Sequence, residues 1–288
     1  MRQARSSFNS QNDENARLER RRNRFANEST IQSSKSNIDP DQPLIGTCET
    51  LEKSYLRLTS APDPSIIRPL YVLEKAFPFI MDKYKANDDW SYVSSQLKSI
   101  RQDLMVQCIR NNFTVRVYEE NARLALEMGD RDQFVQCQTQ LEALYDSDDC
   151  TRSNLAEFLI YRLLYSLLIN DYKRVNRILI DINRVTKTED LNTTLQFCSA
   201  FRRKNYMQLF VFYKSLPRLA QCLVNLFLDI YRKQIIEILI WGFSPTFPME
   251  VVTSMLAYDS DELCQEHLRS LGIKFTPDIP MAIDCKTI

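Results

Sequence analysis

Glycine and histidine are scarce in this 288-residue sequence, which contains four glycines and a single histidine, His267. Average usage would give roughly 20 glycines, so folds that depend on glycine turns, such as Rossmann units, P-loop enzymes and propellers, are poorly supported. Neither GxGxxG, GxxxxGK nor HExxH occurs. One histidine leaves Ser-His catalysis and His-ligated zinc with little to build on. We therefore expect no enzyme activity, no metal and no cofactor.

The eight cysteines are dispersed, and no two lie close enough to form a CxxC motif. Residues 1–10 do not resemble a signal peptide, so we expect a reducing compartment with thiols acting as small buried apolar groups. The longest apolar run, Phe158–Ile169, carries Arg162 and is shorter than the about 20 residues of a transmembrane helix. No membrane association is predicted.

Residues 1–42 are polar and rich in Asn, Ser, Gln and Arg. Such a segment buries too little apolar surface to offset the entropy of ordering, so we predict a disordered tail. Its cluster Arg20–Arg24 is basic, which fits either a nuclear-import or nucleic-acid contact or a chance charge run in a solvated tail.

Apolar residues recur every three or four positions from about Ile66 to Asp229, which predicts amphipathic helices joined by short turns. Three such faces are Leu97, Ile100, Leu104 and Cys108; Phe134, Cys137, Leu141 and Leu144; and Val175, Ile178, Leu179 and Ile182. Short connections such as Gly129-Asp130 favour antiparallel neighbours. Residues 43–228 are therefore predicted to form the helical part of the protein.

A weak internal repeat favours stacked helix pairs. Asp130, Asp171 and Asn205 each occupy a polar break, with apolar residues four and seven positions later. Separations of 41 and 34 residues are typical of tetratricopeptide-like and HEAT-like repeats. The alternative is that any chain of helical hairpins contains such breaks.

The texture changes in residues 229–288. Pro248 fits the first turn of a helix running to about Ala257, Asp259 with Glu262 fits the start of another, and Gly272 fits its end. Extended pieces at 273–276 and 282–287 follow. This order is that of a winged helix. We predict a mainly α fold, a right-handed stack of helical hairpins capped by a C-terminal winged helix, as in a PCI domain.

Two groups of motifs carry a family resemblance. The first consists of Gly46-Thr47-Cys48, Glu52-Lys53-Ser54-Tyr55-Leu56-Arg57-Leu58-Thr59, Ala61-Pro62-Asp63-Pro64 and Arg68-Pro69. The second consists of Ser99-Ile100-Arg101-Gln102-Asp103-Leu104, Phe113-Thr114-Val115-Arg116-Val117-Tyr118-Glu119 and Gln136-Cys137-Gln138-Thr139-Gln140-Leu141. Together they resemble the SAC/GANP domain family, closest to the branch of leukocyte receptor cluster member eight and the fungal THP-type proteins.

The resemblance implies a non-catalytic, nuclear PCI-type subunit that pairs with a second PCI-domain protein. It also implies a small acidic Dss/Sem-type subunit, joined through that partner, and a role in transcription, mRNA processing and export. Glu49-Thr50-Leu51 directly follows Gly46-Thr47-Cys48, where export-complex members tend to carry a second Cys and a Pro-rich insertion. We also expect no long flanking regions of the kind that tether larger relatives to nuclear pores, so a nucleoplasmic role in elongation or splicing is favoured.

Arg101-Gln102-Asp103 suggests an active site, since an Arg and a carboxylate in one turn can act on a polar substrate. Ile100 and Leu104 face the core, however, so we expect these polar residues to satisfy neighbouring helices or backbone groups. The same structural interpretation applies to Tyr118 with Glu119 and to Gln138 with Gln140.

Charge is unevenly distributed, although 37 Lys and Arg balance 37 Asp and Glu. Residues 171–233 contain 12 basic and 5 acidic side chains, a net charge of +7. Candidate contacts to single-stranded RNA are Arg202, Arg203, Lys204, Lys214, Arg218, Arg232 and Lys233. The interleaved aromatics Tyr206, Phe210, Phe212, Tyr213 and Tyr231 fit either base stacking or, the favoured interpretation, the helical core.

The presumptive recognition helix of the winged domain carries Asp261, Glu262 and Glu266, and phosphate would repel it. We expect protein contact there instead, with Trp241, Phe243 and Phe247 as exposed partner-interface candidates. A core role for Trp241 is an equally good interpretation.

Two functions remain open. One is an RNA-binding scaffold in nuclear mRNA biogenesis, in which paired winged helices bring the basic surfaces of two subunits together. The other is a purely structural PCI subunit of a proteasome-lid-like or translation-initiation-like complex, with no nucleic-acid contact.

Overall fold

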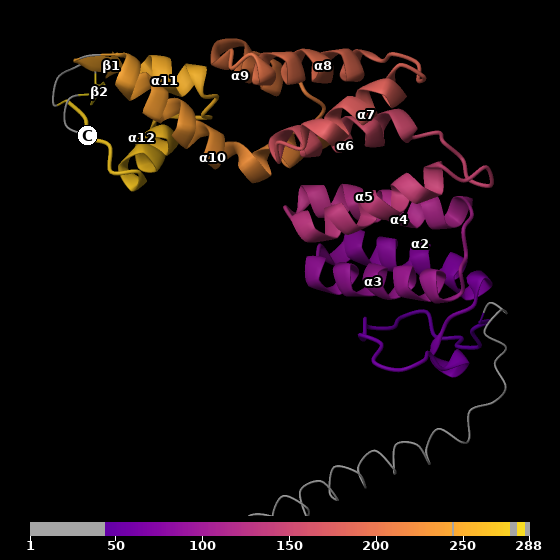
Figure 1. Ribbon diagram of the computed structural model, residues 1–288. Helices are drawn as coiled ribbons and strands as arrows, with labels where there is room; N and C mark the ends of the chain where they lie inside the picture. The colour runs from indigo at the N-terminus through magenta and orange to yellow at the C-terminus, as the bar shows by residue number, and fades with distance from the viewer. Residues whose placement is uncertain (1–43, 244, 277–280, 286–288) are drawn as a thin grey trace, which may run out of the picture. The chain divides into compact units, whose positions relative to one another are not determined.

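The computed structural model describes residues 44–243, 245–276 and 281–285. The predicted disordered tail, its Arg20–Arg24 cluster and residues 286–287 of the last extended piece lie outside these residues. The described part is mainly helical, as predicted (Figure 1). From Ile45 onward it belongs to one unit, Ile45–Ile288.

Helices follow one another with short connections from Leu70 to Gly242. They are α2 (Leu70–Asn87), α3 (Trp90–Val106), α4 (Asn112–Glu127), α5 (Arg131–Tyr145), α6 (Leu155–Leu168), α7 (Tyr172–Ile182), α8 (Glu189–Arg202), α9 (Tyr206–Lys214) and α10 (Arg218–Gly242). Consecutive pairs pack against each other: α2 on α3, α4 on α5, α6 on α7 and α8 on α9. A 3₁₀ turn, η2 (Pro64–Ile66), precedes them.

The second helix of each pair begins in the same way. Asp130, Asp171 and Asn205 are the N-caps of α5, α7 and α9, and each side chain accepts a hydrogen bond from the backbone N–H three residues later. Asp89 caps α3 identically, a member of the repeat that the sequence pattern missed. The predicted breaks are therefore confirmed as helix starts.

The residue before each cap adopts the left-handed conformation, which turns the chain back for the next helix. These residues are Asp88 (φ 50°), Gly129 (φ 70°), Asn170 (φ 61°) and Lys204 (φ 56°). Asp, Gly and Asn tolerate this region, whereas lysine adopts it at a cost. Lys204 is therefore the unusual member of the series.

Gly129→Ala is expected to destabilise the protein by about 1 kcal/mol, because an L side chain is strained at a positive φ. Leu226 Cδ2 lies 3.7 Å from where the new Cβ would be, so the cost is in the backbone and not in a clash. Urea unfolding measures the change. Gly242→Ala is the matched control, since Gly242 has no positive φ and no atom within 4 Å of the Cβ position; equal midpoints would contradict the assignment.

Two clusters of buried apolar side chains form the core, one across α2, α3 and α4 and a larger one from α4 to the C-terminus. The predicted apolar faces lie in them, with one correction. Cys108 is exposed, because α3 ends at Val106 and Cys108 occupies a left-handed turn (φ 54°) beyond it. Leu179 is only half-buried, since α7 and α8 leave a groove between them.

A small C-terminal module, residues 246–284, follows α10. It comprises β1 (Thr246–Pro248), α11 (Met249–Met255), α12 (Asp261–Ser270) and β2 (Ala282–Asp284). The predicted helices are present, but Ser260 and not Asp259 caps α12, accepting from Leu263 N–H. The main antiparallel partner of β2 is β1, while the predicted extended piece at 273–276 adds only a bridge between Phe275 and Ile283.

Helix α10 joins the module to the helical pairs. Its N-terminal part packs against α4, α6 and α9, and the predicted domain boundary at 228/229 falls within this continuous helix. Arg232 secures the joint: its guanidinium donates to the carbonyls of Leu256 (3.1 Å) and Ala257 (2.8 Å) and lies 3.9 Å from the ring centre of Tyr258.

Candidate partner and nucleic-acid interfaces

The motif residues of the helical part hold the non-helical segment 45–69 against α3. Asp103 is fully buried and accepts hydrogen bonds from Lys53 and from Arg68 Nε, the latter at 2.7 Å. Arg68 is also fully buried, and its other nitrogens donate to Leu51 O (2.9 Å) and Ser99 Oγ (3.0 Å). A buried charge persists only with such partners. We call Lys53, Arg68, Ser99 and Asp103 the clasp.

Gln107 and Gly46 extend the clasp. Gln107 accepts from Gly46 N–H at 3.1 Å and donates to Arg68 O at 2.8 Å. A Cβ on Gly46 would lie 2.2 Å from Ile67 O, so only glycine allows this close approach of two backbone segments. The motif thus fixes the start of the helical part.

Two further buried motif side chains, Arg101 and Glu119, also have structural partners. Arg101 is buried and donates to Gln133 Oε1 (2.8 Å), while Glu119 accepts from Tyr145 OH (2.5 Å) and Asn154 Nδ2 (2.7 Å). Burial and the Glu119 carboxylate raise the pKa of Tyr145. These contacts confirm the structural interpretation of Arg101, Asp103 and Glu119.

Four of the predicted RNA-binding cations are exposed and have no ion-pair partner among the described residues. Arg202 ends α8, Arg203 and Lys204 form the turn to α9, and Lys233 lies on α10; all four are exposed. Lys214, at the end of α9, is exposed as well and lines a depression beside Arg232 and Asp259. The structure therefore brings three consecutive cations together at one helical turn.

Two predicted cations are engaged inside the protein. Arg218 pairs with Glu127 of α4, and Arg232 makes the joint to the C-terminal module and pairs with Asp229 at 3.7 Å. Charge reversal of Arg232 would disturb the fold as well as any phosphate contact, so it is unsuitable as a probe of binding.

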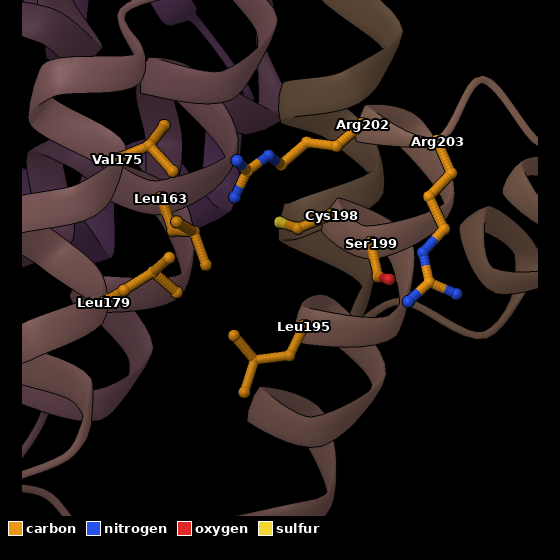
Figure 2. A pocket seen from close by; sticks show the side chains of 8 residues that line it. All are labelled: Leu163, Val175, Leu179, Leu195, Cys198, Ser199, Arg202 and Arg203. Carbon is orange, nitrogen blue, oxygen red and sulfur yellow. The ribbon is translucent and has the colours of Figure 1, made fainter.

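Arg202 and Arg203 border a groove of about 450 Å³ between α7 and α8. Figure 2 shows the Arg202 side chain extending from α8 toward Val175, over an apolar floor that includes Leu163 and Leu179. Cys198 lies in this floor, and burial raises the pKa of its thiol to about 12. Because the thiol stays protonated at neutral pH, it is a poor nucleophile there.

The aromatic residues of the basic segment belong largely to the core. Phe210 is buried, and Tyr206, Phe212, Tyr213 and Tyr231 are half-buried and pack against the larger cluster. Partial exposure leaves some ring surface at Tyr206 and Tyr231 open to a cavity beside α10.

Exposed apolar side chains lie at the C-terminal end of α10. Trp241 is 91% exposed, Phe243 47% and Ile238 49%. Trp241 is therefore not part of the core. Ile238 was not among the sequence-predicted interface residues, but it lies one turn before Trp241 on the same helix face, and this spacing could have identified it. Phe247 corrects the expectation of an exposed side chain: it is buried, because β1 places it opposite Ile283 and against Phe243, with ring centres 4.4 Å apart.

Within the part of the chain that the structure describes, no three or more His, Cys, Asp or Glu side chains gather as a metal site. No described helix is both long and apolar enough to cross a membrane.

A family model and several similar proteins indicate the same family for this chain. The model of the SAC3/GANP family matches residues 17–277. The chain is 37% identical to a leukocyte receptor cluster member 8 homolog of Xenopus laevis, over 88% of this chain and 32% of the relative. It is also 37% identical to a THP3 homolog of Schizosaccharomyces pombe, over 95% and 70%, and to Protein THP3 of Saccharomyces cerevisiae, over 72% and 45%. The chain thus spans about a third of the frog protein's length.

Proposed function

Because this chain belongs to the SAC3/GANP family, we propose that it is a non-catalytic nuclear subunit that pairs with a second PCI-domain protein. In this proposal the pair contributes RNA-binding surface to mRNA processing and export, and a small acidic Dss/Sem-type subunit joins through the partner.

The order of elements supports a PCI architecture. Helical pairs from α2 to α9 precede α10, and the C-terminal module then supplies two short helices and a two-stranded antiparallel sheet. The observed order is α10, β1, α11, α12 and β2, and these three helices with one antiparallel strand pair fit a winged helix. In β1–β2 the strands come from before α11 and after α12, so the sheet closes the module around its own helices.

The observation that carries the pairing proposal is Trp241. A tryptophan 91% exposed leaves a large apolar surface in water, and such residues are enriched at protein interfaces, where they bind in desolvated pockets. Ile238 and Phe243 enlarge this apolar surface, and the ring of Phe247 packs against that of Phe243. We name Ile238, Trp241 and Phe243 the apolar end of α10.

Trp241→Asp is expected to weaken pairing by about a hundredfold or more, since truncating a central aromatic anchor typically costs 2 kcal/mol or more and the aspartate adds a desolvated charge. Tagged full-length chain is purified from nuclear extract, and the ratio of co-purified PCI-domain protein to bait is quantified by mass spectrometry. The fold of the variant is expected to be unchanged, because the side chain lies outside the core.

Ile180→Asp is the matched control, because Ile180 is 57% exposed on α7, away from the apolar end. Recovery of a PCI partner with Ile180→Asp but not with Trp241→Asp supports the proposal. Equal recovery with both variants, or the absence of any PCI partner from wild-type material, contradicts it.

Binding to RNA then depends on both subunits. The four exposed candidate cations Arg202, Arg203, Lys204 and Lys233 are too few for tight binding at physiological salt, where affinity grows with the number of neutralised phosphates. We therefore expect the isolated chain to bind single-stranded RNA weakly, with a slope of log affinity against log salt of about 3 for these four contacts. Tight, salt-insensitive binding by the isolated chain would contradict this mechanism.

A further inference from the structure

A second cavity, of about 370 Å³, lies beside the turn that carries Lys204. Its walls come from the α6–α7 turn, the α8–α9 turn and the middle of α10. Five aromatic side chains line it: Tyr172, Phe201, Tyr206, Phe227 and Tyr231. We call it the aromatic pocket. It is distinct from the groove of Figure 2, although Arg202 borders both.

The polar residues that line the aromatic pocket also restrict which ligand it could bind. Asn170 and Gln234 contribute amides, of which Asn170 Oδ1 accepts from Tyr172 OH at 3.1 Å. Lys204 contributes positive charge, with Arg202 beside it, although the Arg202 guanidinium extends toward Val175 in the groove of Figure 2. No Asp or Glu lines the pocket. The carboxylate next in sequence, Asp171, is turned away to cap α7, where it accepts from Arg174 N–H at 3.0 Å. The pocket therefore offers flat apolar faces, amide donors and acceptors, and cations at its edge.

Lys204 is held at this edge at an energetic cost. It occupies the left-handed position that Gly129 and Asn170 occupy in the equivalent turns, and residues in sparsely populated backbone regions cluster at binding sites. The aromatic walls are positioned by internal contacts. Tyr231 donates to Leu168 O at 2.7 Å, and its ring meets Phe201 edge to face with centres 5.0 Å apart.

We propose that the aromatic pocket binds one unstacked base of single-stranded RNA, with the adjoining phosphate at Lys204. Aromatic faces stack on any base, amides bond base edges, and a cation neutralises the backbone, which is the combination found here. An acidic peptide would use the cations but leave the amides and most of the ring surface without purpose. This inference rests on the proposed RNA contact and gives it a specific site.

The test separates base from phosphate. Binding of the full chain is measured at low salt by fluorescence anisotropy, with a labelled oligouridine and with the same oligonucleotide made abasic. Tyr206→Ala is expected to weaken binding of oligouridine about tenfold, the contribution of one stacked base, and to leave binding of the abasic strand unchanged. Lys204→Glu is expected to weaken both. Tyr71→Ala is the matched control, because Tyr71 is an exposed tyrosine on α2.

A second measurement does not depend on the variants folding. Oligouridine containing 4-thiouridine is cross-linked to the wild-type chain, and adducts are expected on Tyr206, Tyr231 or their neighbours in the pocket. Adducts confined to other elements, or equal effects of Tyr206→Ala on both strands, overturn the base pocket while leaving the phosphate contacts of the proposed function intact. If Lys204→Glu weakens neither strand and no cross-link forms, the RNA role itself fails, and an acidic peptide that competes at the pocket then becomes the ligand to test.

Discussion

Asp103→Ala is expected to lower the free energy of unfolding by roughly 3–5 kcal/mol, the range for removing one partner of a buried ion pair. The carboxylate is fully buried and is the shared acceptor of Lys53 and Arg68. Without it, the fully buried Arg68 guanidinium keeps only Leu51 O and Ser99 Oγ as acceptors. Segment 45–69 should therefore loosen from α3 before the helices unfold.

Urea unfolding followed by circular dichroism measures the loss, and limited proteolysis tests whether cleavage begins within residues 45–69. Asp82→Ala is the matched control, since Asp82 pairs with Lys85 at 3.3 Å on the surface, where such pairs add little. Similar midpoints for the two variants would show that the clasp does not stabilise the fold. Replacing Arg68 and Asp103 together by Met and Leu should recover part of the loss, because the fully buried guanidinium is removed together with its carboxylate, and Lys53 keeps Ile66 O as an acceptor.

The clasp shows which features could be predicted from the sequence and which could not. The period of Ile100 and Leu104 placed Asp103 beside the apolar stripe of its helix and predicted a structural role, which the contacts confirm. Its partners could not be predicted, because Lys53 and Arg68 lie 50 and 35 residues earlier in a segment with no periodicity. The starts of the helices could be predicted from the sequence because an N-cap is a local signal. The N-cap of α12 was misplaced by one residue, from Ser260 to Asp259, because both side chains can accept a hydrogen bond from a backbone N–H.

Long-range pairing explains the other differences. The partner of β2 is β1, which precedes α11 and α12. The sequence indicated only the extended piece at 273–276 as a neighbour of residues 282–287, because these two segments lie close together in the chain. The pairing of β1 with β2 is also what buries Phe247. The candidate cations were identified by composition, but composition does not tell which of them the fold uses. Arg232 is taken by the carbonyls of Leu256 and Ala257, whereas Arg202, Arg203 and Lys204 stay at one exposed turn.

Charge reversal at Arg202, Arg203, Lys204 and Lys233 is expected to weaken binding of single-stranded RNA by the purified heteromeric complex by about a hundredfold or more near physiological salt. Each phosphate contact contributes roughly 0.7 to the slope of log affinity against log salt for single strands. Losing four contacts should therefore lower that slope by about 3. The Glu variants are suitable because none of these four side chains has an ion-pair partner among the described residues, so the substitutions break no ion pair there.

The matched control reverses four exposed cations outside the basic segment, Arg57, Lys75, Arg110 and Arg116, and should leave the slope unchanged. Anisotropy titrations across a salt series give the slopes, and the PCI partner must co-purify equally with both variants for the comparison to concern RNA alone. If the two quadruple variants bind RNA equally well, this chain contacts no phosphate through α8, α9 and α10. The apolar end of α10 and the basic turn are separate surfaces, so the Trp241 variant and the charge-reversal variant test pairing and RNA contact independently. If pairing depends on Trp241 but RNA binding does not depend on the cations, the purely structural PCI subunit is favoured.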